Sequence, residues 1–329
     1  MLLLSRFVNC LVLLSLTLSV GRVYASQDDA WIVLQKAAQA AHELSYKGVF
    51  LYQSGGASKS VQLTHMNYGQ GEYARMMVLD GSPREVLAQG SDASIYSPKN
   101  EKVMIEKKRG QNMFPALLPS NLDVLKNCYQ SQLGPQERVG GRDAQVVTLL
   151  PKDHMRYGFR FWADKEYGLL LKVAMLNDQG TPLEQIAFSQ LAWMEDQNMD
   201  WFRPKVDHSK AYVMGNDSAA PAKVDAADVD FAVTELPQGY RKIDQVKQTV
   251  QGKSAPVTQL IFSDGLSSIS LFIEPLAKGI RPRVGHTVVG ATNIYALINE
   301  GHQVMVVGEV PETTVMQFAN AINFKVKAK

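Results

Sequence analysis

The sequence predicts an α+β protein built from two domains. A stretch near the N-terminus has apolar residues at helical spacing, and the segments after it alternate between apolar and polar residues with the period of a β-strand. The apolar pattern fails from residue 195 to residue 230, after which strand-like segments and one helix-like segment resume. Helices and strands in separate runs are typical of the α+β class, and the interruption predicts a linker between two domains.

The first 25 residues have the three parts of a secretory signal peptide. Arg6 supplies a positive charge, residues 7–20 are apolar, and residues 21–25 end in small residues where a signal peptidase cleaves. We therefore expect cleavage after Ala25. An uncleaved anchor is the alternative, but the apolar run is shorter than the roughly 20 residues that span a bilayer. Cys10 lies early in the run and not at its end, which argues against a lipoprotein cysteine.

Composition limits the kinds of partner and the source of stability. Cleavage leaves 329 − 25 = 304 residues, enough for about two domains of ~150 residues. Arg6 and Arg22 are removed with the signal, so 34 − 2 = 32 basic residues face 32 acidic residues. This balance predicts no nucleic-acid partner, because binding a phosphate backbone requires a surplus of Lys and Arg. Cys128 is the only cysteine left, which excludes an internal disulfide, so hydrophobic cores must stabilise the chain.

The predicted first domain, residues 26–200, begins with a helix and continues as antiparallel strands. The helix is indicated by residues at helical spacing: Trp31, Leu34, Ala38, Ala41 and Ser45. Strands are expected at residues 46–52, 61–66, 72–79, 84–89, 94–96 and 102–106. Their connections are too short for parallel crossovers, so the strands must form a meander.

Residues 107–136 interrupt this series. Pro115 and Pro119 bracket an apolar loop, and Leu122, Leu125 and Cys128 allow a short helix. Strands resume at residues 144–150, 157–163, 169–177 and 183–193. One or a few helices against a long sheet are therefore expected in this domain.

Residues 201–229 are predicted to be the linker, and residues 230–329 a smaller α+β domain. Residues 236–240 indicate a turn, and Asp264 and Gly265 form the turn of a hairpin between residues 258–263 and 267–273. Further strands are expected at residues 283–289, 291–298 and 302–307, followed by a helix with one apolar stripe: Val315, Phe318, Ala319 and Ile322.

The motifs of common enzymes are absent from the sequence, so we predict no catalytic residues, no metal site and no cofactor. No zinc-protease, nucleophile-elbow or phosphate-loop pattern occurs, and no two of the six histidines lie three or four residues apart. A metal site assembled from distant histidines stays open as an alternative. Cys128 is interpreted as a core residue and not as a nucleophile.

Two features favour a binding surface for lipid. Several strands are rich in aromatic residues and methionine, and some are apolar on both faces, so that one face needs a cover or a ligand. The candidate lipid-binding residues are Phe50, Tyr52, Met76, Met77, Tyr96 and Phe161. The second feature is a basic triplet beside the apolar loop at residues 113–118, which could hold an anionic lipid: Lys107, Lys108 and Arg109. The alternatives are an ordinary core and a solvated hairpin end.

Several segments together resemble the RseB family of sigma-E regulatory proteins, also called MucB. In the first domain these are residues 78–86 (VLDGSPREV), 161–164 (FWAD), 171–173 (LKV) and 183–185 (LEQ). In the second domain they are residues 236–240 (LPQGY), 262–266 (FSDGL) and 307–311 (VGEVP). No single segment is specific, but their order and spacing agree with the family from about Trp31 to Phe324.

The resemblance implies a fold and a function. The fold is an N-terminal open antiparallel β-barrel curled over helices, like the lipoprotein carriers LolA and LolB, with a smaller C-terminal α+β domain. The resemblance implies that the first domain senses lipid and that the C-terminal domain binds the protein partner. The implied function is negative regulation of the envelope-stress response in the periplasm. Such proteins bind the periplasmic domain of the anti-sigma factor RseA and protect it from the first-cut protease DegS. Lipopolysaccharide or lipoprotein acyl chains are expected to release the complex.

Two other functions stay open at this point. A periplasmic carrier of lipid or lipoproteins would need only the first domain, so the second domain favours the regulator. An exported hydrolase would need a catalytic set that no sequence pattern indicates. Exposed sheet edges also allow self-association into a homodimer.

Overall fold

The computed structural model describes residues 27–69, 71–90, 92–99, 102–109, 113–195, 198–203, 212–214, 222–223, 231–248, 255–276, 279 and 281–324. The expected signal peptide lies outside these residues. Among them, strands form one sheet of twelve, one of seven and one of two. No described helix is long and apolar enough to cross a membrane.

The twelve-stranded sheet is made from two meanders. The first contains β1 (Tyr46–Ser54), β2 (Ala57–Tyr68), β3 (Gly71–Val78), β4 (Arg84–Gln89), β5 (Asp92–Lys99) and β6 (Lys102–Arg109). The second contains β7 (Tyr129–Val139), β8 (Arg142–Pro151), β9 (Gly158–Asp164), β10 (Leu170–Leu176) and β11 (Pro182–Trp193). The meanders are joined where β1 pairs with β11, and β12 (Tyr212–Met214) lies at the far edge beside β6. The full order is β12-β6-β5-β4-β3-β2-β1-β11-β10-β9-β8-β7.

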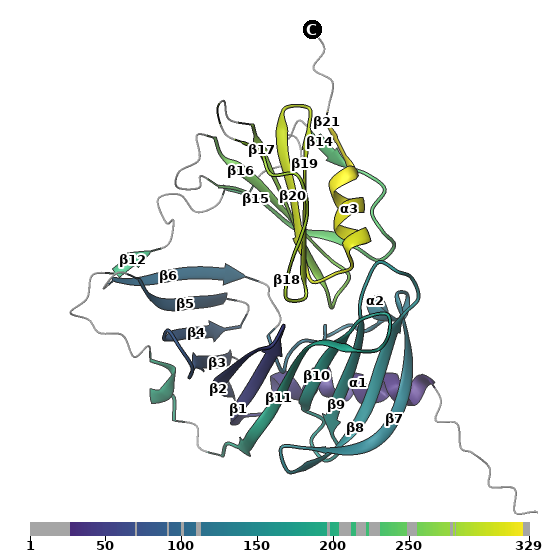
Figure 1. Ribbon diagram of the computed structural model, residues 1–329. Coiled ribbons are helices and arrows are strands. Elements are labelled where there is room, and N and C mark those ends of the chain that lie inside the picture. Colours follow the sequence, from purple (N-terminus) through teal and green to yellow (C-terminus); the bar gives the residue numbers. More distant parts are fainter. Residues whose placement is uncertain are drawn as a thin grey trace, which may run out of the picture.

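The second meander curls while the sheet as a whole stays open. The β7–β8 turn reaches β11, where an added side chain at Gly140 would meet the carbonyl of Phe188. Helix α1 (Gln27–Glu43) crosses β7, β8 and β9 (Figure 1). Its buried side is mostly alanine, which lets the helix approach the sheet closely: Ala30, Leu34, Ala37, Ala38 and Ala41. The predicted open antiparallel β-barrel curled over helices is thereby confirmed as an open, curled sheet with α1 packed against it.

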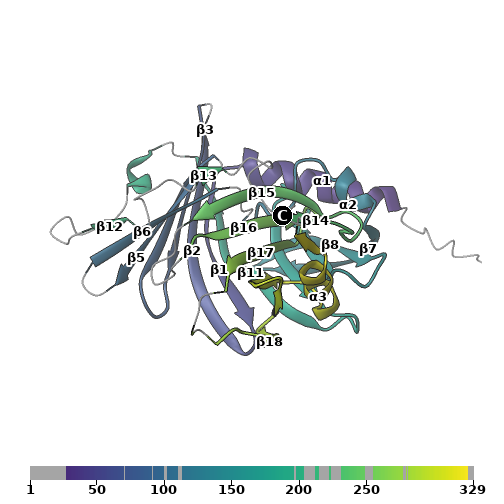
Figure 2. The same ribbon diagram turned by 90° about the horizontal axis from the view of Figure 1, so that it is seen from above.

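The smaller unit is a second α+β layer. Its sheet has the order β13-β15-β16-β17-β20-β19-β18, with α3 (Glu312–Asn320) packed on one face. The strands are β13 (Ala222–Lys223), β15 (Arg241–Gln248), β16 (Val257–Ser263), β17 (Ser268–Pro275), β18 (Gly285–Val289), β19 (Thr292–Asn299) and β20 (His302–Gly308). A two-stranded sheet pairs β14 (Phe231–Val233) with β21 (Ile322–Phe324). Figure 2 shows the seven-stranded sheet in front of the larger one.

Three features differ from the sequence prediction. Residues 107–136 were expected to interrupt the sheet, but β6 runs to Arg109 and β7 starts at Tyr129. β7 was not predicted because it contains Pro135, which is rare within strands. Proline fits here because β7 is an edge strand and because its register with β8 shifts between Leu133 and Gln136. The second difference is that β14, β15 and β21 lie where no strand was expected. The third is that β12 (Tyr212–Met214) pairs with β6 in parallel.

The residues predicted as a linker contribute to both sheets. Within residues 201–229, β12 joins the edge of the larger sheet and β13 joins β15 of the smaller sheet. A short 3-10 helix at Asp200–Phe202 precedes them, and short α2 (Asp123–Lys126) lies in the first domain. The boundaries of the two domains stay a prediction.

Candidate functional site

The predicted lipid-binding residues are divided between the two faces of the larger sheet. Tyr52 aligns across β11, β10 and β9 with Phe161, so these two side chains share a face. Phe50 lies two residues from Tyr52, and Met76 shares its face through Leu63 and Gly48. Met77 pairs with Glu85 and Glu85 pairs with Tyr96, which places Met77 and Tyr96 on the other face. We call the side that carries Phe50 the core face.

Two of these residues belong to the hydrophobic core. Phe161 is fully buried and stacks on Phe159 at 5.9 Å. Phe50 is buried against Phe114 and Phe188, with ring centroids 5.2 and 6.2 Å away. Phe114 comes from the apolar loop at residues 113–118, which therefore packs onto the core face.

The other core-face residues are half-buried. Met76 packs at the margin of the core. The Tyr52 hydroxyl donates to Glu184 Oε1 at 2.7 Å. Burial has the larger effect and this hydrogen bond the next, and both raise the pKa of Tyr52, which is about 12. Tyr52 and Met76 are thus the members of the predicted set that lie on the core face without being part of its interior.

The basic triplet is placed only by its backbone. Lys107, Lys108 and Arg109 lie at the end of β6, opposite Ser94, Ala93 and Asp92 of β5. Their side chains lie outside the described residues. The lipid-binding role of the whole predicted set stays a prediction.

A buried charge cluster, which we call the clasp, connects the two units. Arg156 and Asp264 are both fully buried, and Arg156 Nη1 donates to Asp264 Oδ2 at 2.8 Å. Arg156 also donates from Nε and Nη2 to the two carboxylate oxygens of Asp153, each at 3.0 Å. The Tyr129 hydroxyl donates to Asp264 Oδ2 at 3.3 Å, and the guanidinium lies 5.0 Å from the ring centre of Tyr240. Arg156 is therefore enclosed by groups from both units.

The charges of the clasp stabilise one another. Burial opposes the charge of Arg156, but hydrogen bonds to Asp153 and the field of Asp264 outweigh it, so the pKa of Arg156 lies above its ordinary value. Asp264 Oδ1 accepts from the backbone N–H groups of Leu266 and Ser267 at 3.0 and 2.8 Å, which holds the β16–β17 turn in place. Removing either member would leave the other charge buried and unpaired, so we expect the pair to favour this arrangement of the two units.

Neighbouring contacts extend the junction around the clasp. The carbonyl of Met155 accepts from the Tyr240 hydroxyl at 3.1 Å and from Thr314 Oγ1 at 2.9 Å. Gly239 has a φ of +87°, and a side chain there would overlap the Cys128 Sγ. Burial raises the pKa of the Cys128 thiol, in agreement with its interpretation as a core residue.

A second ionisable cluster joins the end of α1 to the sheet. The Glu72 carboxylate lies 2.9 Å from His42 Nδ1 and 3.0 Å from His65 Nε2. Burial opposes ionisation, but the hydrogen bonds to the two histidines prevail and lower the pKa of Glu72 to about 2. His42 and His65 are 23 residues apart in the sequence and share this one carboxylate. No group of side chains in the described part of the chain has the arrangement of a metal site.

Sequence reasoning did not find the clasp. Asp264 was identified only as a turn residue, and Arg156 was not singled out at all. The segment before β9 contains Asp153 and Arg156 three residues apart, which gives no signal of burial by itself. Its partner Asp264 is 108 residues away, in the other unit.

The comparisons with known families cover both units. The MucB/RseB N-terminal domain family matches residues 29–206, and the MucB/RseB C-terminal domain family matches residues 225–323. The chain belongs to the MucB/RseB family. The family resemblance in the sequence is thus confirmed, and the second match contains the Asp264 side of the clasp.

Similar proteins match this chain over more than 90% of its length. The sigma-E factor regulatory protein RseB of Haemophilus influenzae is 24% identical, over 95% of this chain and 97% of its own. The sigma factor AlgU regulatory protein MucB of Pseudomonas aeruginosa is 29% identical, over 96% of this chain and 97% of its own. Among solved structures, MucB in complex with MucA(peri) is 25% identical with a TM-score of 0.72, covering 91% of this chain and 100% of MucB.

Proposed function

We propose that this chain is a periplasmic negative regulator of an envelope-stress sigma factor. It binds the periplasmic domain of a membrane anti-sigma factor and protects that protein from the protease that makes the first cut. The observation that carries this proposal is the likeness, over 91% of this chain, to MucB bound to MucA(peri). The relatives from Haemophilus influenzae and Pseudomonas aeruginosa are both sigma factor regulatory proteins by name.

We also propose that the chain acts by binding and not by catalysis. The clasp supports this proposal, because Arg156 and Asp264 neutralise each other inside the junction and are not exposed to a substrate. Glu72 is likewise held between two histidines. Location in the periplasm is supported by the expected signal peptide at residues 1–25 and by the periplasmic part of MucA in the related complex.

Lipid is proposed to release the partner. Tyr52 and Met76 lie on the core face and are half-buried, so acyl chains of lipopolysaccharide or lipoproteins could cover them. A lipid that prefers the unbound form must weaken partner binding by the same factor by which the partner weakens lipid binding. The two ligands then compete by linkage, without having to share a site.

The test is a pull-down of residues 26–329 with the periplasmic segment of the anti-sigma factor, repeated with lipopolysaccharide. Capture that weakens with lipid is expected for the regulator. No capture, with lipid still bound, would favour a lipid carrier and contradict the proposal.

Two variants locate the lipid. Met76→Gln, on the core face, should weaken the effect of lipopolysaccharide, whereas Met77→Gln, the next residue on the other face, should leave it unchanged. Phe50 and Phe161 are unsuitable for this test, because truncating buried aromatic residues costs about 3–5 kcal/mol of stability. Equal responses of the two methionine variants would exclude the core face as the lipid site.

A further inference from the structure

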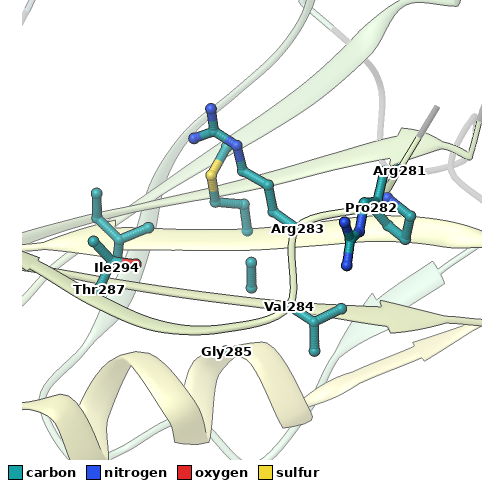
Figure 3. A pocket seen from close by; sticks show the side chains of 9 residues that line it. Arg281, Pro282, Arg283, Val284, Gly285, Thr287 and Ile294 are labelled. Atoms are coloured by element: carbon teal, nitrogen blue, oxygen red, sulfur yellow. The ribbon is translucent and has the colours of Figure 1, made fainter.

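A pocket of about 660 Å³ lies at the β18 edge of the smaller sheet. Figure 3 shows Arg281, Arg283 and Val284 from the segment before β18, together with Ile294 from β19. The backbone of Arg283 is fixed at both polar groups: its N–H donates to Gln303 Oε1 at 2.9 Å, and its carbonyl accepts from Gln303 Nε2 at 2.8 Å. The side chain of Gln303 therefore holds the chain segment at the rim of the pocket in place.

The floor of the pocket is the face of the sheet that α3 does not cover. Tyr295 and Leu297 of β19 and Val304 and Val306 of β20 pack in the core with α3. Because side chains alternate along a strand, the intervening Ile294, Ala296 and Met305 point to the opposite face, where they line the pocket. The pocket thus combines an apolar floor with a basic rim.

Strand β18 is an edge without the usual protection against pairing. It has β19 as its single neighbour in the seven-stranded sheet. Val284, Val288 and Val289, in and beside it, are 68%, 55% and 64% exposed. Edge strands normally carry charged residues that prevent another chain from pairing with them, but residues 284–289 (VGHTVV) contain no Lys, Arg, Asp or Glu.

The other side of the same sheet shows the usual protection. Strand β15 carries Arg241, Lys242, Asp244 and Lys247, and β13 covers its outer end. Within one sheet, β15 is therefore charged and the edge strand β18 is not. An edge without charges is expected where another chain pairs with it. An extended segment that pairs with such an edge gains main-chain hydrogen bonds, and pockets beside it select its side chains.

The charge of the rim identifies the chemistry of that segment. Arg281 and Arg283 are exposed, and neither forms an ion pair with a carboxylate in the described part of the chain. Two free guanidinium groups favour carboxylates, with which they form bidentate hydrogen bonds. The apolar floor favours aliphatic or aromatic side chains at alternate positions.

We propose that the β18 edge and its pocket bind an extended, acidic segment of the protein partner, which adds a strand to the smaller sheet. This inference rests on the proposed function, because it locates the contact made by the anti-sigma factor. The far end of β18 lies at the junction of the two units, where Gly290 approaches Ser54 and Gly55 of the β1–β2 turn. A segment that occupies the whole edge therefore ends beside the larger sheet.

The experiment measures the affinity of the periplasmic segment of the anti-sigma factor for three forms of residues 26–329. These are the wild type, R281E/R283E and a matched control, R241E/K242E, which reverses two exposed charges on β15. R281E/R283E should bind about tenfold more weakly at low salt, and the difference should shrink at high salt. The control should bind like the wild type, and all three should have the same melting temperature.

Hydrogen exchange of the amides at residues 285–289 is the second readout, because strand addition protects edge amides whether or not the arginines contribute. Protection in the complex, with weaker binding of R281E/R283E, supports the inference. Equal binding of all three forms, with unchanged exchange in β18, overturns it while the proposed function stands.

The remaining outcomes are also separable. Failure of the wild type to bind the segment contradicts the proposed function itself. If R281E/R283E binds the segment normally but loses binding to lipopolysaccharide, the arginines hold an anionic lipid, and the docking inference is wrong.

Discussion

Replacing Arg156 with methionine would leave the carboxylate of Asp264 buried without its cation. Asp264 would keep only the Tyr129 hydroxyl at 3.3 Å and two backbone N–H groups at 3.0 and 2.8 Å. Breaking a buried ion pair by removing one member costs about 3–5 kcal/mol. Because hydrogen bonds to Asp264 remain, we expect R156M to lower the free energy of unfolding by about 3 kcal/mol.

Asp264→Asn should be less damaging. Arg156 would retain both oxygens of Asp153 at 3.0 Å, and the new amide oxygen could still accept from the β16–β17 turn. We expect a loss of about 1–2 kcal/mol. The double variant should lose about 1–3 kcal/mol less than the sum of the two single variants, because the residues contact each other directly.

Urea unfolding followed by two signals measures these effects. All four tryptophans lie at or before residue 201, so fluorescence reports on the larger unit, whereas circular dichroism reports on both. The transitions should coincide in the wild type and separate in R156M, since the clasp couples the units. Arg138→Met, which removes an exposed pair with Asp143 at 3.5 Å, is the control and should change stability by less than about 1 kcal/mol. A loss below about 1 kcal/mol in R156M, with coincident transitions, would refute this account of the clasp.

Two further predictions concern packing and pH. Gly239→Ala should lower the free energy of unfolding by about 2–4 kcal/mol, because the new methyl group would overlap the Cys128 Sγ. The φ of +87° at residue 239 adds backbone strain for any residue but glycine. Gly141→Ala, with a φ of +82° and open space around it, should cost only about 1 kcal/mol, and equal losses in thermal unfolding would contradict the packing argument. Glu72→Gln removes a carboxylate whose pKa is lowered from 4.5 to about 2, so its contribution is present above pH 4.5 and is lost as the pH falls through 2. The hydrogen bond that His42 donates to Glu72 raises the pKa of His42, so the stability from this bond is present below pH 6.5 and is lost as the pH rises through the raised value. Both contributions are present between pH 4.5 and 6.5, so Glu72→Gln should lower the free energy of unfolding most in this range. The expected loss is roughly 1–2 kcal/mol, because the carboxylate is one-third exposed and therefore partly screened by solvent. A difference in melting temperature that does not change with pH would exclude the Glu72–His42 pair as the cause of the loss.

The sequence was sufficient for features that depend on neighbouring residues. Alternation and short turns predicted β1 to β6 as a meander, and the apolar stripe at Val315 and Phe318 predicted α3, because period and connection length are local properties. The missed strands lack these signals. β7 contains Pro135, and β15 is mostly polar, so each is stabilised by its neighbours and not by its own pattern.

The candidate sites depended on contacts between distant segments. Aromatic and methionine content identified the residues of the larger sheet, but register alone separated Met76 from Met77 and placed Phe161 inside the core. A charged residue such as Arg156 is expected at the surface unless a partner is available, and that partner lies 108 residues away. The sequence by itself thus determined the fold class, the family and the strand order of the first meander. Only the tertiary structure decided which charges are buried together and which edge is left unprotected, because both depend on where distant segments meet.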